Sequence, residues 1–196
     1  MPAYDPVAAG ALCDRCPLRG SVVVPPSGRG DADVVIVGEA PGFNEVKQGK
    51  PFVGASGVKL ADLLLETQFK TRDSLFITNT LLCRPEVPGV EGKERYNVKR
   101  YIAWLRKENM RRKKVSEPLL ESPFTCCAPR LYRELERAEW YARVRNCPNG
   151  AVVIPLGNFA LGAIVQGQPG KAQGIMKYRG SVIPLDTPPW RRGETP

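Results

Sequence analysis

The fold of this chain is decided by one stretch, Asp33-Val34-Val35-Ile36-Val37-Gly38-Glu39-Ala40-Pro41-Gly42. Its first half is short, apolar and rich in β-branched residues, which predicts a buried parallel strand over 33–37. Its second half is a glycine-flanked turn at the carboxyl end of that strand, where ligands of open α/β sheets bind. Glycine lets backbone N–H groups approach a ligand closely, and Glu39 adds a carboxylate there. The alternative is a tight turn carrying a solvated glutamate, and the neighbouring motifs decide between the two.

Strand and helix patterns alternate along the rest of the chain, which predicts a single α/β domain spanning residues 1–196. We expect a three-layer α/β/α sandwich around a central, four-stranded, mostly parallel sheet. Residues 38–55, 115–127 and 167–180 are expected to be loops or irregular segments. The expected strands cover 33–37, 74–79, 151–156 and 181–185, and the expected helices cover 56–69, 93–114, 131–144 and 158–165.

Composition narrows the class of protein. The chain has 196 residues, 42% of them hydrophobic, with six cysteines and no histidine. It shows neither an apolar run near the ~20 residues that span a bilayer nor a signal peptide. We therefore expect a cytoplasmic protein in which the cysteines are ligands or free thiols. Because the chain has no histidine, the ligands of any metal site have to be thiolates and carboxylates.

The formal charge of +9 is concentrated in one segment. Residues 93–114 contain ten Lys or Arg against two Glu, so this segment carries a net +8. Tyr96, Tyr101 and Trp104 lie between the basic residues. This mixture is typical of contact with the phosphate backbone of nucleic acid. The alternative is a solvated amphipathic helix whose aromatic residues pack inward, and both can hold for the same helix.

The cysteines indicate one shared metal centre. Cys13 and Cys16 are spaced to bind it from a single loop. Cys83 follows the second expected strand, and Cys126 and Cys127 precede Pro129. Four thiolates suit either a zinc ion or a [4Fe-4S] cluster, and spacing alone does not separate the two. Either group would hold the irregular amino-terminal segment against the loop that follows the second expected strand. Its role would then be architectural. Cys147 stands apart and is read as an ordinary half-buried thiol.

Taken in order, the motifs resemble the iron–sulfur (family 4) uracil-DNA glycosylases. The likeness runs from about Cys13 to Ser181 and is broken by a basic insertion near residues 86–125. Its motifs are Cys13-x2-Cys16, Gly38-Glu39-Ala40-Pro41-Gly42, Gly49-Lys50-Pro51-Phe52-Val53-Gly54-x-Ser56-Gly57, Thr78-Asn79-x3-Cys83-Arg84-Pro85 and Cys127-x-Pro129-x-Leu131.

The resemblance implies the fold, the cofactor and the site. It implies a monofunctional hydrolase that removes uracil from single- or double-stranded DNA during base-excision repair, acting as a monomer in a prokaryotic or phage-encoded setting. Glu39 and the Gly38–Gly42 backbone would lie beside the attacking water, with Glu45 as a further acidic position. Phe52 would stack on the everted uracil and Asn79 would read its edge. Cys13, Cys16, Cys83 and Cys127 would hold the [4Fe-4S] cluster, Cys127 being preferred to Cys126 because Pro129 lies two residues after it.

One family motif is missing. The family carries a His-Pro-Ser-like motif after the last strand, whose histidine donates to uracil O2, and this chain has no histidine. Either the sequence is truncated before the motif, or Thr187-Pro188-Pro189-Trp190 is a degenerate remnant of it, with Arg191 or Arg192 as electrostatic substitutes. The loss predicts weak or absent activity. The alternatives are therefore a catalytically inactive iron–sulfur module that binds nucleic acid, and a zinc-stabilised α/β domain of other function.

Overall fold

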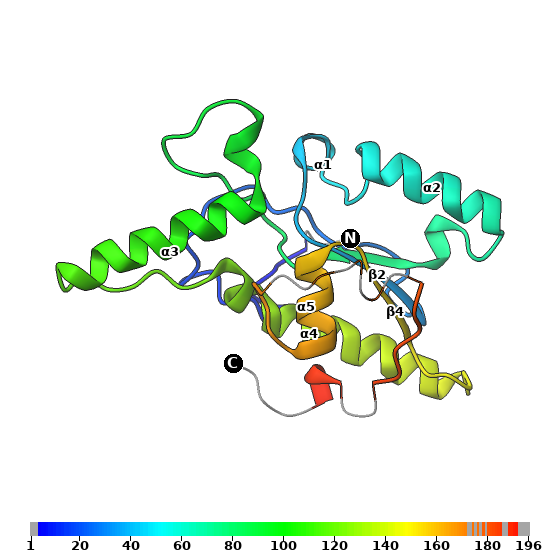
Figure 1. Cartoon of the computed structure of the whole chain (residues 1–196). Helices are drawn as coiled ribbons and strands as arrows, with labels where there is room; N and C mark the ends of the chain where they lie inside the picture. Colours follow the sequence, from blue (N-terminus) through cyan, green and yellow to red (C-terminus); the bar gives the residue numbers. More distant parts are fainter. Residues whose placement is uncertain are drawn as a thin grey trace.

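The structure is a computed structural model that describes residues 4–171, 174, 176, 178, 180–185 and 188–191 (Figure 1). Lys177, Arg179, Thr187 and Arg192, which belong to the carboxyl-terminal motifs discussed above, lie outside the described residues. Among the helices of the described part, none is both long enough and apolar enough to cross a membrane.

A four-stranded sheet forms the centre of the molecule. Strand β2 (Val34–Gly38) lies between β3 (Phe76–Asn79) and β4 (Val152–Pro155) and is parallel to both. The short β1 (Ser27–Gly28) pairs antiparallel with β3, so the strand order is β1-β3-β2-β4. All five residues of β2 are buried, as expected for an apolar strand covered on both faces. The predicted mostly parallel sheet is confirmed.

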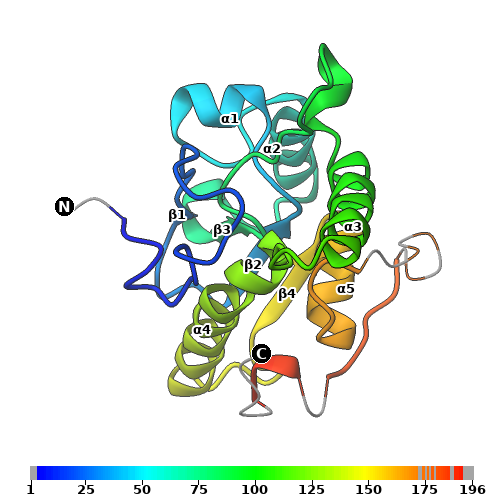
Figure 2. The same cartoon turned by 90° about the vertical axis from the view of Figure 1, so that its left-hand side faces the viewer.

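Helices cover both faces of this sheet, which confirms the three-layer architecture (Figures 1 and 2). Val35 and Val37 point to one face, where they pack against α4 and α5, while Val34 and Ile36 point to the other face and pack against α2. This alternation follows from the two-residue side-chain period of a strand. The helices are α1 (Phe43–Gln48), α2 (Ala55–Thr67), α3 (Val98–Lys114), α4 (Pro123–Val144) and α5 (Asn158–Gln166), with 3₁₀ turns at Arg72–Ser74, Lys93–Tyr96 and Pro189–Arg191.

The prediction of a strand over 181–185 is wrong. The structure has no strand there, and β1 supplies the fourth strand instead. Val182 is 95% exposed, and only the end of the segment, at Leu185, packs against the core. Pro184 also lacks the N–H that a ladder position needs.

Several helix boundaries also differ from the sequence-based expectation. The segment expected to be irregular contains the start of α4 at Pro123, so Cys126 and Cys127 lie inside this helix. Pro129 is read from sequence as preceding the helix, yet α4 continues through it. The loop over 38–55 contains α1, and the basic segment is divided at Asn97, which caps α3 by accepting from the Arg100 N–H at 3.1 Å.

Buried tyrosines predict a loss of stability at alkaline pH. Burial raises the pKa of Tyr132 from 10.0 to about 12, and it raises the pKa of Tyr4 and Tyr101 further. The unfolded chain releases these protons near pH 10, whereas the folded chain retains them. The stability they contribute is therefore complete below about pH 10 and is lost as the pH rises toward 12 and beyond. Phenolate absorbance during an alkaline titration should show delayed ionisation that coincides with unfolding, and an early, complete titration would contradict this.

Candidate functional site

The two segments singled out from the sequence meet at the carboxyl edge of the sheet. Gly38 is the register partner of Asn79 across β2 and β3. The pairing continues beyond the strands, because Thr80 N–H donates to Gly38 O at 2.8 Å and Leu81 N–H donates to Glu39 O at 3.0 Å. The glycine turn and the end of β3 are thus held side by side.

Asn79 and Phe52 converge on Gly38. A Cβ atom placed on Gly38 would lie 2.2 Å from Asn79 Oδ1 and 2.7 Å from Phe52 Cζ. Both distances are shorter than any contact such an atom can make, so a glycine is required where the amide and the ring approach the backbone. Asn79 is 3% exposed and Phe52 is half-buried. The structure therefore brings together three residues of the predicted site.

Glu45 holds the Phe52 loop against the glycine turn. Its Oε1 accepts from the Val53 N–H at 2.9 Å and from the Gly54 N–H at 2.6 Å, and its Oε2 accepts from the Gly42 N–H at 3.1 Å. Phe52 has a φ of 53°, in the left-handed region that is costly for a bulky residue. Three backbone donors on one buried carboxylate provide the contacts that keep this loop in place.

Glu39 lies between the turn and the start of α5. Its Oε1 accepts from the Phe159 N–H at 3.0 Å, so the carboxylate caps one of the free N–H groups of α5. Gly157, with a φ of 111°, makes room for it, since a Cβ there would lie 2.5 Å from Glu39 Oε1. The sequence indicated the carboxylate but not these two partners.

Arg130 is a residue that the sequence analysis missed. It lies on α4, its side chain is completely buried, and it contacts the end of β3. Its Nη2 donates to Asn79 O at 2.8 Å and to Thr80 O at 3.0 Å, and its Nη1 donates to Thr78 Oγ1 and Glu134 Oε2, both at 2.9 Å. The available signal was an Arg130–Glu134 pair at i,i+4 within an otherwise apolar helix face.

Five of the six cysteines line one cavity of about 150 Å³, formed by the amino-terminal segment, the segment after β3 and the start of α4. The amino-terminal segment is joined to the other two through its backbone, because Leu12 N–H donates to Cys126 O at 2.9 Å and Val24 N–H donates to Leu82 O at 2.8 Å. The Leu18 N–H donates to Cys16 Sγ at 3.4 Å. The five cysteines are Cys13, Cys16, Cys83, Cys126 and Cys127.

The apolar cavity disfavours the thiolate form of three of these cysteines. Burial raises the pKa of Cys16 to about 11 and the pKa of Cys83 and Cys126 to about 12. Thiolates in such apolar surroundings need a bound cation to offset their desolvation. Over the described residues, no group of three or more Cys, Asp or Glu side chains is arranged to hold a metal ion. Cys147 stands apart as expected, half-buried, with its Sγ 3.8 Å from Asp33 Oδ2.

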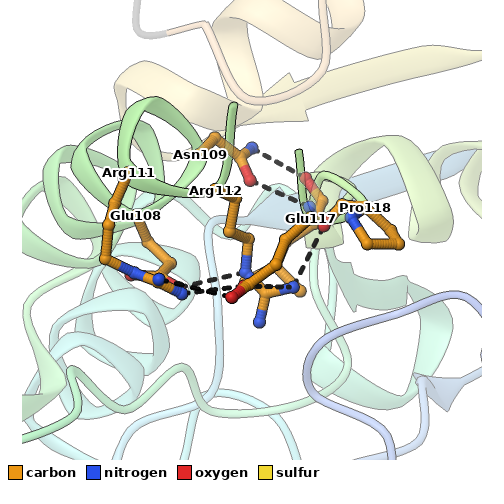
Figure 3. Close-up of polar contacts among 7 residues, drawn as sticks. Glu108, Asn109, Arg111, Arg112, Glu117 and Pro118 are labelled. Carbon is orange, nitrogen blue, oxygen red and sulfur yellow. Dashed lines mark hydrogen bonds and ion pairs between the residues drawn. The ribbon is translucent and has the colours of Figure 1, made fainter. Parts of the chain in front are cut away.

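The far end of α3 is bound to the chain that returns from it (Figure 3). Arg111 pairs with Glu108 and Glu117, and Arg112 pairs with Glu108. The Asn109 amide exchanges two hydrogen bonds with the backbone of Leu120, at 2.8 and 2.9 Å. These contacts hold the insertion in a defined conformation and neutralise part of its charge.

Other basic residues of the insertion keep their charge unpaired. Lys93, Lys99, Arg106, Lys107, Lys113 and Lys114 form no ion pair within the described part of the chain, and all six are exposed. Tyr101, Ile102 and Leu105 are buried on the opposite face of α3. A groove of about 380 Å³ between α3 and residues 169–171 is lined by Arg106 and Lys171. The helix therefore packs one face and presents a cationic face, the combination that the sequence left open.

Replacing Gly38 with alanine should damage the site without unfolding the protein. The new methyl group would displace both Asn79 Oδ1 and Phe52 Cζ. A shift of about 1 Å in a site residue costs about 10²-fold in rate, so we expect a loss of that size in any reaction the site performs. Gly30→Ala is the matched control, because nothing lies within 4 Å of a Cβ there. Equal rates for the two variants would show that this convergence has no functional role.

Comparison with known proteins identifies the family. A family model described as the uracil DNA glycosylase superfamily matches residues 25–194. The chain is similar to type-4 uracil-DNA glycosylases of Sulfurisphaera tokodaii (45% identical over 75 residues), Archaeoglobus fulgidus (43% over 75) and Thermotoga maritima (45% over 78). Each alignment covers 37% of this chain, and the aligned parts span 34%, 37% and 38% of those relatives. With the parallel sheet and the glycine turn already described, the match over residues 25–194 establishes that this chain belongs to the uracil-DNA glycosylase superfamily.

Proposed function

We propose that this protein hydrolyses the N-glycosidic bond of uracil in DNA. The observation that carries the proposal is the convergence of the Asn79 amide and the Phe52 ring on the Gly38 backbone, one residue before Glu39. The similarity of the chain to type-4 uracil-DNA glycosylases supports the same substrate class.

The geometry suits an extruded pyrimidine. A base inside a duplex is out of reach, so the nucleotide has to flip out at a cost of a few kcal/mol. Stacking on an aromatic ring such as Phe52 recovers about 1–3 kcal/mol. The Asn79 carboxamide accepts a hydrogen bond from uracil N3–H and donates one to uracil O4. Cytosine has an acceptor at N3 and a donor at its 4-amino group, so the same carboxamide orientation cannot pair with it. A site built on such hydrogen bonds can discriminate by about 10⁴-fold.

The acidic residues take different parts in this proposal. Cleavage leaves a uracil anion and a sugar with oxocarbenium character, so a carboxylate near the sugar and donors near the base both lower the barrier. Glu39 holds the attacking water and faces the developing cation, and the Gly38–Gly42 turn offers backbone groups to the substrate. Glu45 acts on the reaction through the loop that carries Phe52, since backbone N–H groups engage both of its oxygens.

We propose that the cysteine cavity holds a [4Fe-4S] cluster through Cys13, Cys16, Cys83 and Cys127. Three observations support the fit: five cysteines around one cavity, a backbone N–H on the Cys16 sulfur, and the buried Arg130 Nε, which has no hydrogen-bond partner among the described residues. An unmet buried donor of this kind costs about 1–3 kcal/mol, which sulfur acceptors in the cavity would offset. The bound cluster supplies a covalent junction between three chain segments and carries no step of the hydrolysis.

The insertion near residues 86–125 supplies contacts to DNA within the same domain. The unpaired cations of α3 suit the phosphate backbone, and neutralising phosphates releases counterions. Phe43, 65% exposed, and Tyr96 flank Arg84, whose guanidinium lies 5.7 and 3.3 Å from their ring centroids and adds stacking surface beside the turn. We propose that one monomer binds single- or double-stranded uracil-containing DNA in the cytoplasm of a prokaryotic or phage-infected cell.

Charge removal on α3 should weaken the salt dependence of DNA binding. The double variant Arg106→Gln/Lys107→Gln removes two exposed cations, and each phosphate contact contributes about 0.9 to the slope of log K against log salt. We expect that slope to become shallower by about 2 on duplex DNA. Arg111→Gln is the matched control, since Glu108 and Glu117 already neutralise this arginine and its loss should change the slope less. Fluorescence anisotropy over a salt series measures both slopes, and equal changes would contradict the proposal.

An oligonucleotide assay tests the function itself. Uracil-containing DNA is incubated with the purified protein and then treated with alkali, which cleaves at abasic sites. The absence of the family's histidine removes one donor to the leaving group, so we expect excision about 10²–10³-fold slower than in a glycosylase that has it. Tight DNA binding without any product would favour an inactive binding module. A colourless protein containing one zinc would favour the zinc-stabilised alternative.

A further inference from the structure

Arg130 lies on α4 one turn after Cys127, which lines the cysteine cavity, and it contacts the base-reading end of β3. It follows Cys127 by three residues on α4, so the two side chains share one face of the helix. Cys13 and Cys83 line the same cavity as Cys127 and reach it from two other segments. The far side of its guanidinium contacts the backbone of Asn79.

The donors of this guanidinium can be counted. Arginine has five N–H groups and no acceptor. The Nη1 pair donates to Thr78 Oγ1 and Glu134 Oε2, and the Nη2 pair donates to the carbonyl oxygens of Asn79 and Thr80. Glu134 also accepts from Tyr4 Oη at 2.9 Å and from Thr78 Oγ1 at 3.0 Å, which completes the ion pair. Only the Nε–H remains without a partner among the described residues.

We propose that Arg130 is a positioning residue that joins the cysteine cavity to the uracil-reading Asn79. Its unpaired Nε–H would donate to a sulfur acceptor in the loaded cavity, while Nη2 holds the carbonyls of Asn79 and Thr80. The ion pair with Glu134 is electrically neutral overall, so the arginine contributes directed hydrogen bonds rather than net charge. This inference rests on the proposed function and extends it, because it makes the geometry of the base site depend on occupancy of the cavity.

Arg130→Lys provides the main test, with two comparison variants. Lysine keeps the charge but cannot reproduce the fork that spans two carbonyls and the cavity. A hydrogen bond to a cluster sulfur stabilises the reduced, more negative state, so its loss should shift the reduction potential of the bound cluster to a more negative value. Single-turnover excision should fall about 10²-fold as Asn79 loses its support, with unchanged affinity for uracil-free DNA. Arg137→Lys, exposed on the same helix, should alter neither the potential nor the rate.

Thr78→Val separates this role from general loosening of the core. It removes an acceptor of Nη1 but leaves Nη2 and Nε untouched, so it should lower the melting temperature without moving the potential. A potential that shifts equally in Thr78→Val and Arg130→Lys would overturn the proposal. If Arg130→Lys also loses iron, its iron content is compared with that of Thr78→Val, provided that the two variants have the same melting temperature. Iron that is retained in Thr78→Val supports the proposal. Iron that is lost equally from both variants refutes it. A wild-type protein without excision would refute the proposed function, whereas an active wild type matched by Arg130→Lys in rate and potential would refute this inference alone.

Discussion

Glu39→Gln should lower the rate of uracil excision by about 10²–10⁴-fold, the usual contribution of a positioned acid–base group. Glutamine has nearly the same shape, and its carbonyl oxygen can still accept from the Phe159 N–H that Glu39 Oε1 now receives. The amide cannot take a proton from the attacking water, and it carries no charge to stabilise the sugar cation. The rate should therefore fall while the melting temperature stays close to that of the wild type. Single-turnover kinetics on uracil-containing DNA together with thermal unfolding measure both quantities.

Glu66→Gln is the control for this experiment. Glu66 is an exposed carboxylate in the last turn of α2 and is no part of the proposed site, so removing its charge should leave the rate unchanged. If Glu39→Gln retains the full rate, the carboxylate serves only to cap α5, and the proposed assignment of the water-activating group is wrong. A variant that loses rate and stability together would also indicate a purely structural role.

Cys83→Ser should abolish the visible absorption of the cluster and strongly lower thermal stability. Cys83 carries the segment after β3 into the cysteine cavity, where the amino-terminal segment and α4 also meet. Loss of a structural metal group removes on the order of several kcal/mol of folding free energy. At about 2–4 °C per kcal/mol for a chain of this size, the melting temperature should fall by about 10 °C or more. Iron analysis, visible spectroscopy and calorimetry give the three readouts.

Cys147→Ser is the matched control, since Cys147 lies outside the cavity and its thiol lies beside Asp33. It should keep the full iron content, colour and melting temperature. Equal iron content in the two variants would contradict the assignment of Cys83 as a ligand. Comparing Cys126→Ser with Cys127→Ser in the same way identifies the fourth ligand, and we expect only the second to lose the cluster.

The sequence alone was sufficient to predict the three central strands of the sheet and to name the residues that meet at the candidate site. Strands over 33–37, 74–79 and 151–156 were predicted within one or two residues, because buried parallel strands have an apolar pattern that local composition reveals. The family resemblance implied that Glu39 and Asn79 share one site, and the pairing of β2 with β3 brings the two residues to the same edge of the sheet. The edge strand β1 was missed because two residues have no pattern of their own, and their pairing with β3 depends on tertiary contact.

Tertiary structure decided what holds these residues in place. These contacts are the three N–H groups on Glu45, the crowding of Asn79 and Phe52 over Gly38, and the hydrogen bonds from Arg130 to the end of β3. They join residues that are up to 52 positions apart in the chain. The start of α4 has a local signal that was missed, with Ser122 at the N-cap and Pro123 at the first helical position, whereas the continuation of the helix through Pro129 goes against local propensity and depends on packing. Local sequence determines which chemical groups are available and which edge of the sheet they reach, because propensity and side-chain period act over a few residues. The buried hydrogen bonds that orient those groups form only when distant segments pack, so their partners follow from the folded structure alone.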